Sequence, residues 1–224
     1  MHLFVTGTDT DVGKTLVCAA LLHQASARGL AAVGMKPVAA GCDDNGVNAD
    51  VAALVAASSV AVGVELVNPY RFAAAIAPHI AAAEAGVRID LEHILACYRQ
   101  ICSRAEAVIV EGAGGFLLPL GEGSDGGDLA QRLALPVVLV VGMRLGCLNH
   151  ALLTAAAIAA RGLTLAGWVA NSVSPAMPRF AENLDSLRQR LDAPLLGVVP
   201  HLARPDPLQV SSYLDPLPTF RSQR

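Results

Sequence analysis

The chain has 224 residues, enough for one domain with a sizeable core. Its hydrophobic fraction of 54%, against 16% charged residues, argues against disorder and for a large buried layer of Ala, Val and Leu. A formal net charge of -3, with no local cluster of Lys and Arg, excludes a basic surface for nucleic acid.

The expected secondary structure alternates between strands and helices. Short apolar runs predict strands at residues 3–6, 31–35, 107–110, 137–141, 163–170 and 195–199. Helical periodicity between Gly and Pro turns predicts helices at residues 14–28, 48–57, 90–104, 148–161 and 178–191. Because the strands are apolar throughout, they should be buried on both faces. This favours an α/β fold, a largely parallel sheet with helices on both faces.

The first loop, GTDTDVGKT at residues 7–15, lies where a strand ends and a helix begins, a place where backbone N–H groups bind anions. Lys14 can reach the β- and γ-phosphates of a nucleotide, and the Thr15 hydroxyl can ligate the magnesium that bridges them. Gly7 is one position too early for the strict Walker A pattern. An ordinary glycine turn with an exposed lysine is the alternative. The strand, the helix and the GKT ending favour a single P-loop NTPase-like domain that binds Mg-ATP.

Three further charged residues follow or begin predicted elements. Lys36 follows the second strand and can hold an anion, or be a solvated loop lysine. Glu111 ends a buried strand and can be a second metal ligand, or simply be solvated. Asp50 begins a helix, where a carboxylate is ordinarily a capping group. Parallel strands bring their carboxyl ends to one edge of the sheet, so Lys36 and Glu111 should lie on the same edge as the loop.

Two positions later in the chain are weaker candidates. Gly146 and Cys147 lead into a helix whose free N-terminus suits a carboxylate or a phosphate, or is an ordinary turn. Asn171 ends a strand, and its carboxamide can pair with adenine. The six histidines show no metal spacing and receive no catalytic role.

The ends of the chain and its cysteines bear on location. The five cysteines are odd in number and lack the C-x-x-C spacing of zinc sites, so we expect a reducing, cytoplasmic environment. Residues 1–6 are too short for a signal peptide, and the apolar stretch 135–143 is far below the roughly 20 residues of a membrane-spanning helix. We expect a domain at residues 1–204 and an extended Pro-rich C-terminal tail at residues 205–224.

Several segments together resemble the dethiobiotin synthetase family, up to about Leu202. They are the loop at 7–15, KPVAAG at 36–41, NPY at 68–70, PHIAA at 78–82, VEGAGG at 110–115, LGCLNHALLT at 145–154 and LAGWVAN at 165–171. The loop of that family also has its first glycine one position too early for the strict Walker A pattern, as Gly7 is here. In this family ATP and Mg²⁺ drive ring closure of 7,8-diaminononanoate with CO2, through a carbamate and a carbamic-phosphoric mixed anhydride. The products are dethiobiotin, ADP and phosphate, in biotin biosynthesis.

The resemblance implies a role for each matching residue. Lys14 and Lys36 would be catalytic, and magnesium would be held by Thr15, Asp50 and Glu111. ATP would contact Asp11, Val12, Gly13, Lys14, Thr15, Leu16, Asp50, Glu111, Gly112, Ala113, Gly114, Asn171, Ser172, Pro200, His201 and Leu202. The diamine would contact Lys36, Ala40, Gly146, Cys147, Leu148 and Asn149, the last four offered by the partner subunit of a homodimer.

Three positions depart from the family pattern. Ala40 and Ala77 stand where hydroxyl residues are common, and Phe116 stands where a tryptophan is familiar. These changes bear on contacts to the diamine and leave the phosphate and metal positions intact.

Two other functions stay open at this stage. One is a P-loop ligase or amidating enzyme of cofactor biosynthesis with a different acyl phosphate, which the segments beyond residue 100 disfavour. The other is an ATPase switch of the partitioning type, whose loop carries an early lysine where this chain has Asp9. Dependence of ATP turnover on a small diamine or on a macromolecule separates these functions from the synthetase.

Overall fold

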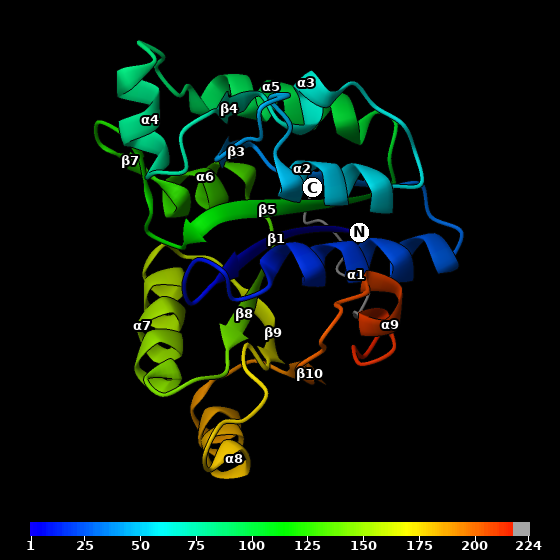
Figure 1. Ribbon diagram of the computed structural model, residues 1–224, viewed down its shortest axis with the longest axis vertical. Helices are drawn as coiled ribbons and strands as arrows, with labels where there is room; N and C mark the ends of the chain where they lie inside the picture. Colours follow the sequence, from blue (N-terminus) through cyan, green and yellow to red (C-terminus); the bar gives the residue numbers. More distant parts are fainter. Residues whose placement is uncertain (217–224) are drawn as a thin grey trace.

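The central element is one parallel sheet. The computed structural model describes residues 1–216, and its main sheet has six strands in the order β10-β9-β8-β1-β5-β2 (Figure 1). All neighbouring strands in this sheet are parallel. The strands are β1 (His2–Gly7), β2 (Ala32–Met35), β5 (Ala107–Gly115), β8 (Val137–Gly142), β9 (Leu165–Asn171) and β10 (Leu195–Val199). Each corresponds to a predicted strand, so the expected α/β class is confirmed.

Helices cover both faces of the sheet, as predicted. In Figure 1, α1 and α9 lie on one side and α5, α6, α7 and α8 on the other. The helices are α1 (Lys14–Ala27), α2 (Ala49–Ala57), α3 (Val64–Val67), α4 (Pro78–Glu84), α5 (Leu91–Cys102), α6 (Gly126–Leu133), α7 (Cys147–Ala160), α8 (Phe180–Arg190) and α9 (Pro207–Ser211). Within residues 1–216, no helix is long and apolar enough to cross a membrane.

Two small ribbons flank the carboxyl edge of the main sheet. The strands β3 (Val38–Ala40) and β4 (Tyr70–Phe72) pair in parallel, and β6 (Pro119–Gly121) pairs antiparallel with β7 (Ser124–Asp125). The sequence did not predict these strands or the helices α3, α4 and α6. They are short, so they contain too few residues for a periodic pattern.

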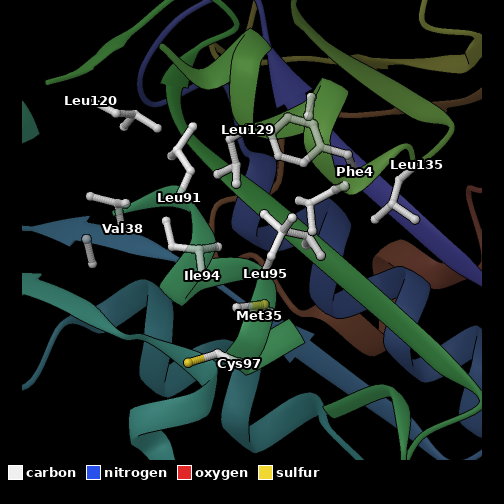
Figure 2. Packing of buried hydrophobic residues seen from close by; sticks show 14 of the residues in the cluster. Phe4, Met35, Val38, Leu91, Ile94, Leu95, Cys97, Leu120, Leu129 and Leu135 are labelled. Carbon is white, nitrogen blue, oxygen red and sulfur yellow. The ribbon is translucent and has the colours of Figure 1, made fainter. Parts of the chain in front are cut away.

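The two faces of β1 show why the sheet is buried on both sides. Successive side chains of a strand point to opposite faces. Phe4 faces the cluster formed with Ile94 of α5 and Leu129 of α6, as Figure 2 shows. Leu3 faces the other way, into a cluster that includes Leu21 of α1. A third cluster surrounds the chain's one tryptophan, Trp168 of β9, which is fully buried.

The segment after residue 204 differs from the expected extended tail. Asp206 caps α9 by accepting a hydrogen bond from the Leu208 amide at 3.1 Å, and Pro207 occupies the first turn, where its missing N–H costs nothing. Val210 is fully buried and Leu214 nearly so, both in the cluster beside α1. The expectation of an extended tail is therefore wrong for residues 205–216. Residues 217–224 lie outside the described part.

Candidate active site

The Asn171 side chain supports the shape of the loop between β1 and α1. Gly13 has a φ of 90°, and a β-carbon there would lie 2.2 Å from Nδ2 of Asn171, so no other residue fits without a shift. Asn171 donates from Nδ2 to the Val12 carbonyl oxygen at 2.8 Å. This bond ties the end of β9 to the loop. The carboxamide therefore supports the loop, and its expected contact with adenine stays a prediction.

Lys14 lies over the loop that precedes it. Its ammonium donates to the carbonyl oxygen of Asp9 at 2.8 Å, and the residue is 6% exposed. Burial lowers the pKa of Lys14, and the neighbouring Lys36 ammonium lowers it further, while Glu111 opposes both. The bond to the Asp9 carbonyl holds the Lys14 ammonium against the backbone of the loop.

Four charged or polar side chains meet beside this loop. Lys36 donates to Asp50 Oδ2 at 2.5 Å and to Glu111 Oε1 at 2.7 Å, and Thr15 Oγ1 donates to the same Glu111 oxygen at 2.9 Å. The topology explains the meeting. Strand β5 lies between β1 and β2, so Glu111 is delivered between the residues that follow those strands. Asp50 arrives from the first turn of α2, a helix capped by the Asn48 side chain.

Burial and charge set the protonation of this cluster. Burial lowers the pKa of Lys36, but the charges of Glu111 and Asp50 outweigh it, and the net pKa is raised. Burial raises the pKa of Asp50, but the Lys36 ammonium outweighs it, and the net pKa is lowered. Burial raises the pKa of Glu111, which is 1% exposed, and Lys36 only partly offsets this. Lys36 therefore stays a cation at neutral pH.

The residues present suit a magnesium ion. Among residues 1–216, Glu111 Oε2 is buried and finds no hydrogen-bond partner, an arrangement that a bound cation relieves. The Thr15 hydroxyl contacts the same carboxylate, and Asp50 adds a second one. Within residues 1–216, no group of three or more His, Cys, Asp and Glu side chains could hold a metal by itself. Mg²⁺ uses one or two carboxylates together with phosphates and water, so the carboxylates of Glu111 and Asp50 fit its coordination.

A cavity of about 940 Å³ opens over the loop and the cluster. This volume is within the range of about 300–1,000 Å³ typical of ligand sites. Sixteen of the expected residues line it: Asp11, Gly13, Lys14, Thr15, Leu16, Lys36, Ala40, Asp50, Glu111, Ala113, Gly114, Asn171, Ser172, Pro200, His201 and Leu202.

Some expected residues do not line this cavity. Val12, a residue of the loop, is 1% exposed and packs in the cluster that includes Leu21 of α1, and Gly112 packs on the Phe4 ring. Gly146, Cys147, Leu148 and Asn149 form the start of α7, outside the cavity walls that residues 1–216 provide. A substrate contact from these four residues in the same chain is therefore not what the structure shows.

One wall of the cavity was not predicted. It is apolar and comes from Val38, Ala39, Ala75, Ile76 and Leu118. These residues carry no reactive group, so no chemical pattern marks them in the sequence. Two family segments lie in or next to this wall: KPVAAG at 36–41, which contains Val38 and Ala39, and PHIAA, which begins α4 at Pro78.

The parallel sheet, the loop that ends in Lys14 and Thr15, and the carboxylates on the same edge define a P-loop NTPase domain. Comparison with known proteins agrees. A family model described as an AAA domain matches residues 1–207. The MinD cell division protein of Aquifex aeolicus has a similar fold, with a TM-score of 0.53 at 15% identity, covering 93% of this chain and 84% of that chain. At this identity the likeness concerns the fold alone.

Relatives with higher sequence identity show which family within the P-loop NTPase class is meant. The ATP-dependent dethiobiotin synthetase BioD of Aromatoleum aromaticum is 58% identical over 214 residues, which cover 94% of this chain and 95% of that protein. The protein of the same name from Nitrosospira multiformis is 56% identical over 212 residues, covering 95% and 93%. The chain belongs to the dethiobiotin synthetase family.

Proposed function

We propose that this protein is an ATP-dependent cyclo-ligase that closes a cyclic urea on 7,8-diaminononanoate with CO2, yielding dethiobiotin, ADP and phosphate. One observation carries the proposal beyond family membership. Lys36, a buried cation, lies between Asp50 and Glu111 inside the cavity that also contains the phosphate loop. A fixed positive charge beside a phosphate loop suits a reaction in which a carbamate attacks a phosphoryl group.

The raised pKa of Lys36 restricts its role. An ammonium that stays protonated at neutral pH is a poor proton acceptor, so Lys36 does not serve as the base that deprotonates the amine. It instead neutralises the carbamate oxygen as that oxygen approaches the γ-phosphorus. Lys14 and the backbone N–H groups of the loop hold the phosphates in line for transfer.

Magnesium fits the oxygen atoms of Thr15, Asp50 and Glu111, and when bound it would neutralise the phosphate charge. The nucleotide contacts that the family resemblance implies for Ala113, Gly114, Ser172 and Pro200 to Leu202 are supported by the place of these residues on the cavity wall. Ala40 lines the same cavity beside Lys36, so the diamine lies against a methyl group there. The apolar wall that includes Ile76 suits the aliphatic chain of this substrate.

The active unit in this proposal is a homodimer. Helix α7 buries few of its side chains and leaves Leu153 61% exposed, and Leu145, just before the helix, is 96% exposed. An apolar helix with this much uncovered surface suits a second copy of the chain. Residues 146–149 at its start would then complete the neighbour's cavity and hold the carboxylate of the diamine. A cytoplasmic location is part of the proposal, supported by five free cysteines.

A mixing experiment tests the shared site. Lys36→Ala and Asn149→Asp variants should each be inactive, because one damages a chain's own cluster and the other damages the neighbour's substrate contact. After subunit exchange the mixture should recover about a quarter of wild-type activity, since mixed dimers keep one intact site. A fully active monomer at assay concentration contradicts the proposal.

The reaction itself is tested with labelled bicarbonate. The purified protein, given Mg-ATP and 7,8-diaminononanoate, should place the label in a neutral cyclic urea in equal proportion to the ADP released. ADP formation should require the diamine and bicarbonate together. ADP release without incorporation of label refutes the synthetase reaction and leaves the nucleotide site intact.

A further inference from the structure

Gln24 on α1 connects the phosphate-loop helix to the C-terminal segment. Its Nε2 donates to the carbonyl oxygens of both Ser211 and Leu214, at 2.9 and 2.8 Å. Both acceptors are carbonyls, so the nitrogen of the carboxamide must face them, and the orientation of the group is settled by its partners. The opposite atom, Oε1, is buried and has no partner in the part of the chain that the structure describes. Gln24 is half-buried, and leaving its Oε1 atom buried and unsatisfied costs free energy, which points to a positional role for the Nε2 end of the amide.

The C-terminal segment is fixed at further points close to Gln24. Leu214 pairs with Gly197 of β10 in an antiparallel bridge, and the amide of Asp215 donates to the Leu196 carbonyl oxygen at 2.6 Å. A β-carbon at Gly197 would lie 2.2 Å from the carbonyl oxygen of Tyr213, so the segment packs directly on the β10 backbone.

The part of the chain between these attachment points reaches the nucleotide cavity. Strand β10 ends at Val199, and the next residues, Pro200, His201, Leu202 and Pro205, line the cavity. This stretch, residues 200–205, is therefore held at one end by the sheet and at the other by the contacts of residues 206–215. Two kinds of contact join this segment to α1, whose first residues are Lys14 and Thr15: the apolar packing of Val210 and Leu214, and the two directional hydrogen bonds from Gln24.

We infer that Gln24 is a positioning residue for nucleotide binding: it fixes residues 200–205 at a set distance from the phosphate loop. The inference rests on the proposed placement of the adenine against Pro200 to Leu202. In this arrangement the phosphates bind at the start of α1. The base binds against residues 200–205, and the chain that follows them is attached to the same helix by Gln24. Loss of this attachment should therefore weaken recognition of the base and leave recognition of the phosphates unchanged.

The test compares two probes by calorimetry in the presence of Mg²⁺: ATP, and inorganic tripolyphosphate, which has the phosphates without the base. The variant Gln24→Met keeps the length of the side chain and removes both donors. It should weaken ATP binding about three- to tenfold, the effect of losing hydrogen bonds of ordinary strength, and leave tripolyphosphate binding unchanged. The KM for ATP should rise by the same factor, with kcat at saturating ATP and the KM for the diamine unchanged.

Controls separate this role from a loss of stability. Gln131→Met removes a glutamine bond of the same type, from α6 to the Arg161 carbonyl oxygen, away from the cavity, and should leave both affinities unchanged. Amide hydrogen exchange at residues 200–214 should quicken in Gln24→Met and slow again on addition of ATP. If Gln24→Met does not fold, Gln24→Ala repeats the comparison.

The outcomes distinguish the inference from the function on which it rests. Wild-type protein that binds tripolyphosphate as tightly as ATP refutes the proposed placement of the base. If Gln24→Met keeps the full wild-type preference for ATP over tripolyphosphate, the role of Gln24 is refuted. If Gln24→Met weakens the binding of ATP and of tripolyphosphate equally, the inference is also overturned, because the substitution would then act on the phosphate loop.

Discussion

Replacing Lys36 by Gln removes one charge from the centre of the cluster and keeps a hydrogen-bond donor, on a side chain one bond shorter. In the structure this cation is bonded to Asp50 and Glu111, and its side chain is 7% exposed. Loss of a fixed, buried charge that stabilises a transition state typically costs about 10²–10³ in kcat. We expect a loss of this size for Lys36→Gln in ring closure, measured as labelled bicarbonate incorporated into the cyclic urea.

The same change has a bounded effect on stability. Removing one partner from a buried ion pair costs about 3–5 kcal/mol when the other charge is left stranded. Two features reduce this cost here. The Asp50 side chain is 45% exposed, so water can solvate it, and burial already raises the pKa of Glu111 toward its neutral form. We therefore expect a loss of about 1–3 kcal/mol in metal-free protein, measured by urea unfolding.

Nucleotide affinity separates a catalytic role from a binding role. Lys36→Gln should bind ATP within about threefold of wild type, since the lysine acts on the reacting carbamate more than on the ground-state nucleotide. Lys36→Arg is the matched control, because it keeps the positive charge but replaces the compact ammonium with a planar guanidinium. This variant should retain more activity than Lys36→Gln. Near-normal kcat in a folded Lys36→Gln variant refutes the electrostatic role.

Three other predictions follow from the loop, the core and the amino terminus. Lys14→Ala should abolish turnover in a protein with an unchanged circular dichroism spectrum, and near-normal activity would refute the phosphate-loop assignment. Val210→Ala, at a fully buried position, should lower the free energy of unfolding by about 2 kcal/mol, whereas Leu208→Ala, at a side chain 63% exposed, should stay within about 0.5 kcal/mol of wild type by urea titration. Burial and the nearby terminal ammonium lower the pKa of His2 from 6.5, so the unfolded chain binds a proton that the folded chain does not. Its contribution to stability is complete above that pH and is lost as pH falls below it, and His2→Gln should flatten this part of the stability profile; an unchanged profile refutes the assignment.

The sequence carried most of the information on the phosphate side of the cavity. The loop at residues 7–15 has a conspicuous pattern, and Lys36 and Glu111 each follow an apolar strand, so a parallel sheet places them on one edge. The order of the strands was not predictable. The contact between Lys36 and Glu111 depends on β2 lying beside β5, which a single sequence does not reveal. Asp50 was ambiguous because a carboxylate in the first turn of a helix is common, and the actual cap is Asn48.

The substrate side and the C-terminal segment were harder to predict. The apolar wall at Ala75 and Ile76 consists of small or aliphatic residues without chemical signature. The last segment has prolines that suggest an extended chain, yet its Asp206-Pro207 pair is a helix start, with a capping carboxylate followed by a proline in the first turn. This helix-start signal was present in the sequence, but the proline content of the segment led to the prediction of an extended chain. Burial of Val210 against α1 is a long-range contact, and local pattern does not encode it.

The single tryptophan gives the molecule a built-in optical probe. Trp168 is fully buried in β9, and it is not among the residues of 1–216 that line the cavity. Its fluorescence should be that of an indole shielded from water in the folded protein and should shift to longer wavelength only when the layer between the sheet and helices α7 and α8 opens. Unfolding of this layer can therefore be followed in the presence of any nucleotide or diamine, free of signals from ligand binding itself.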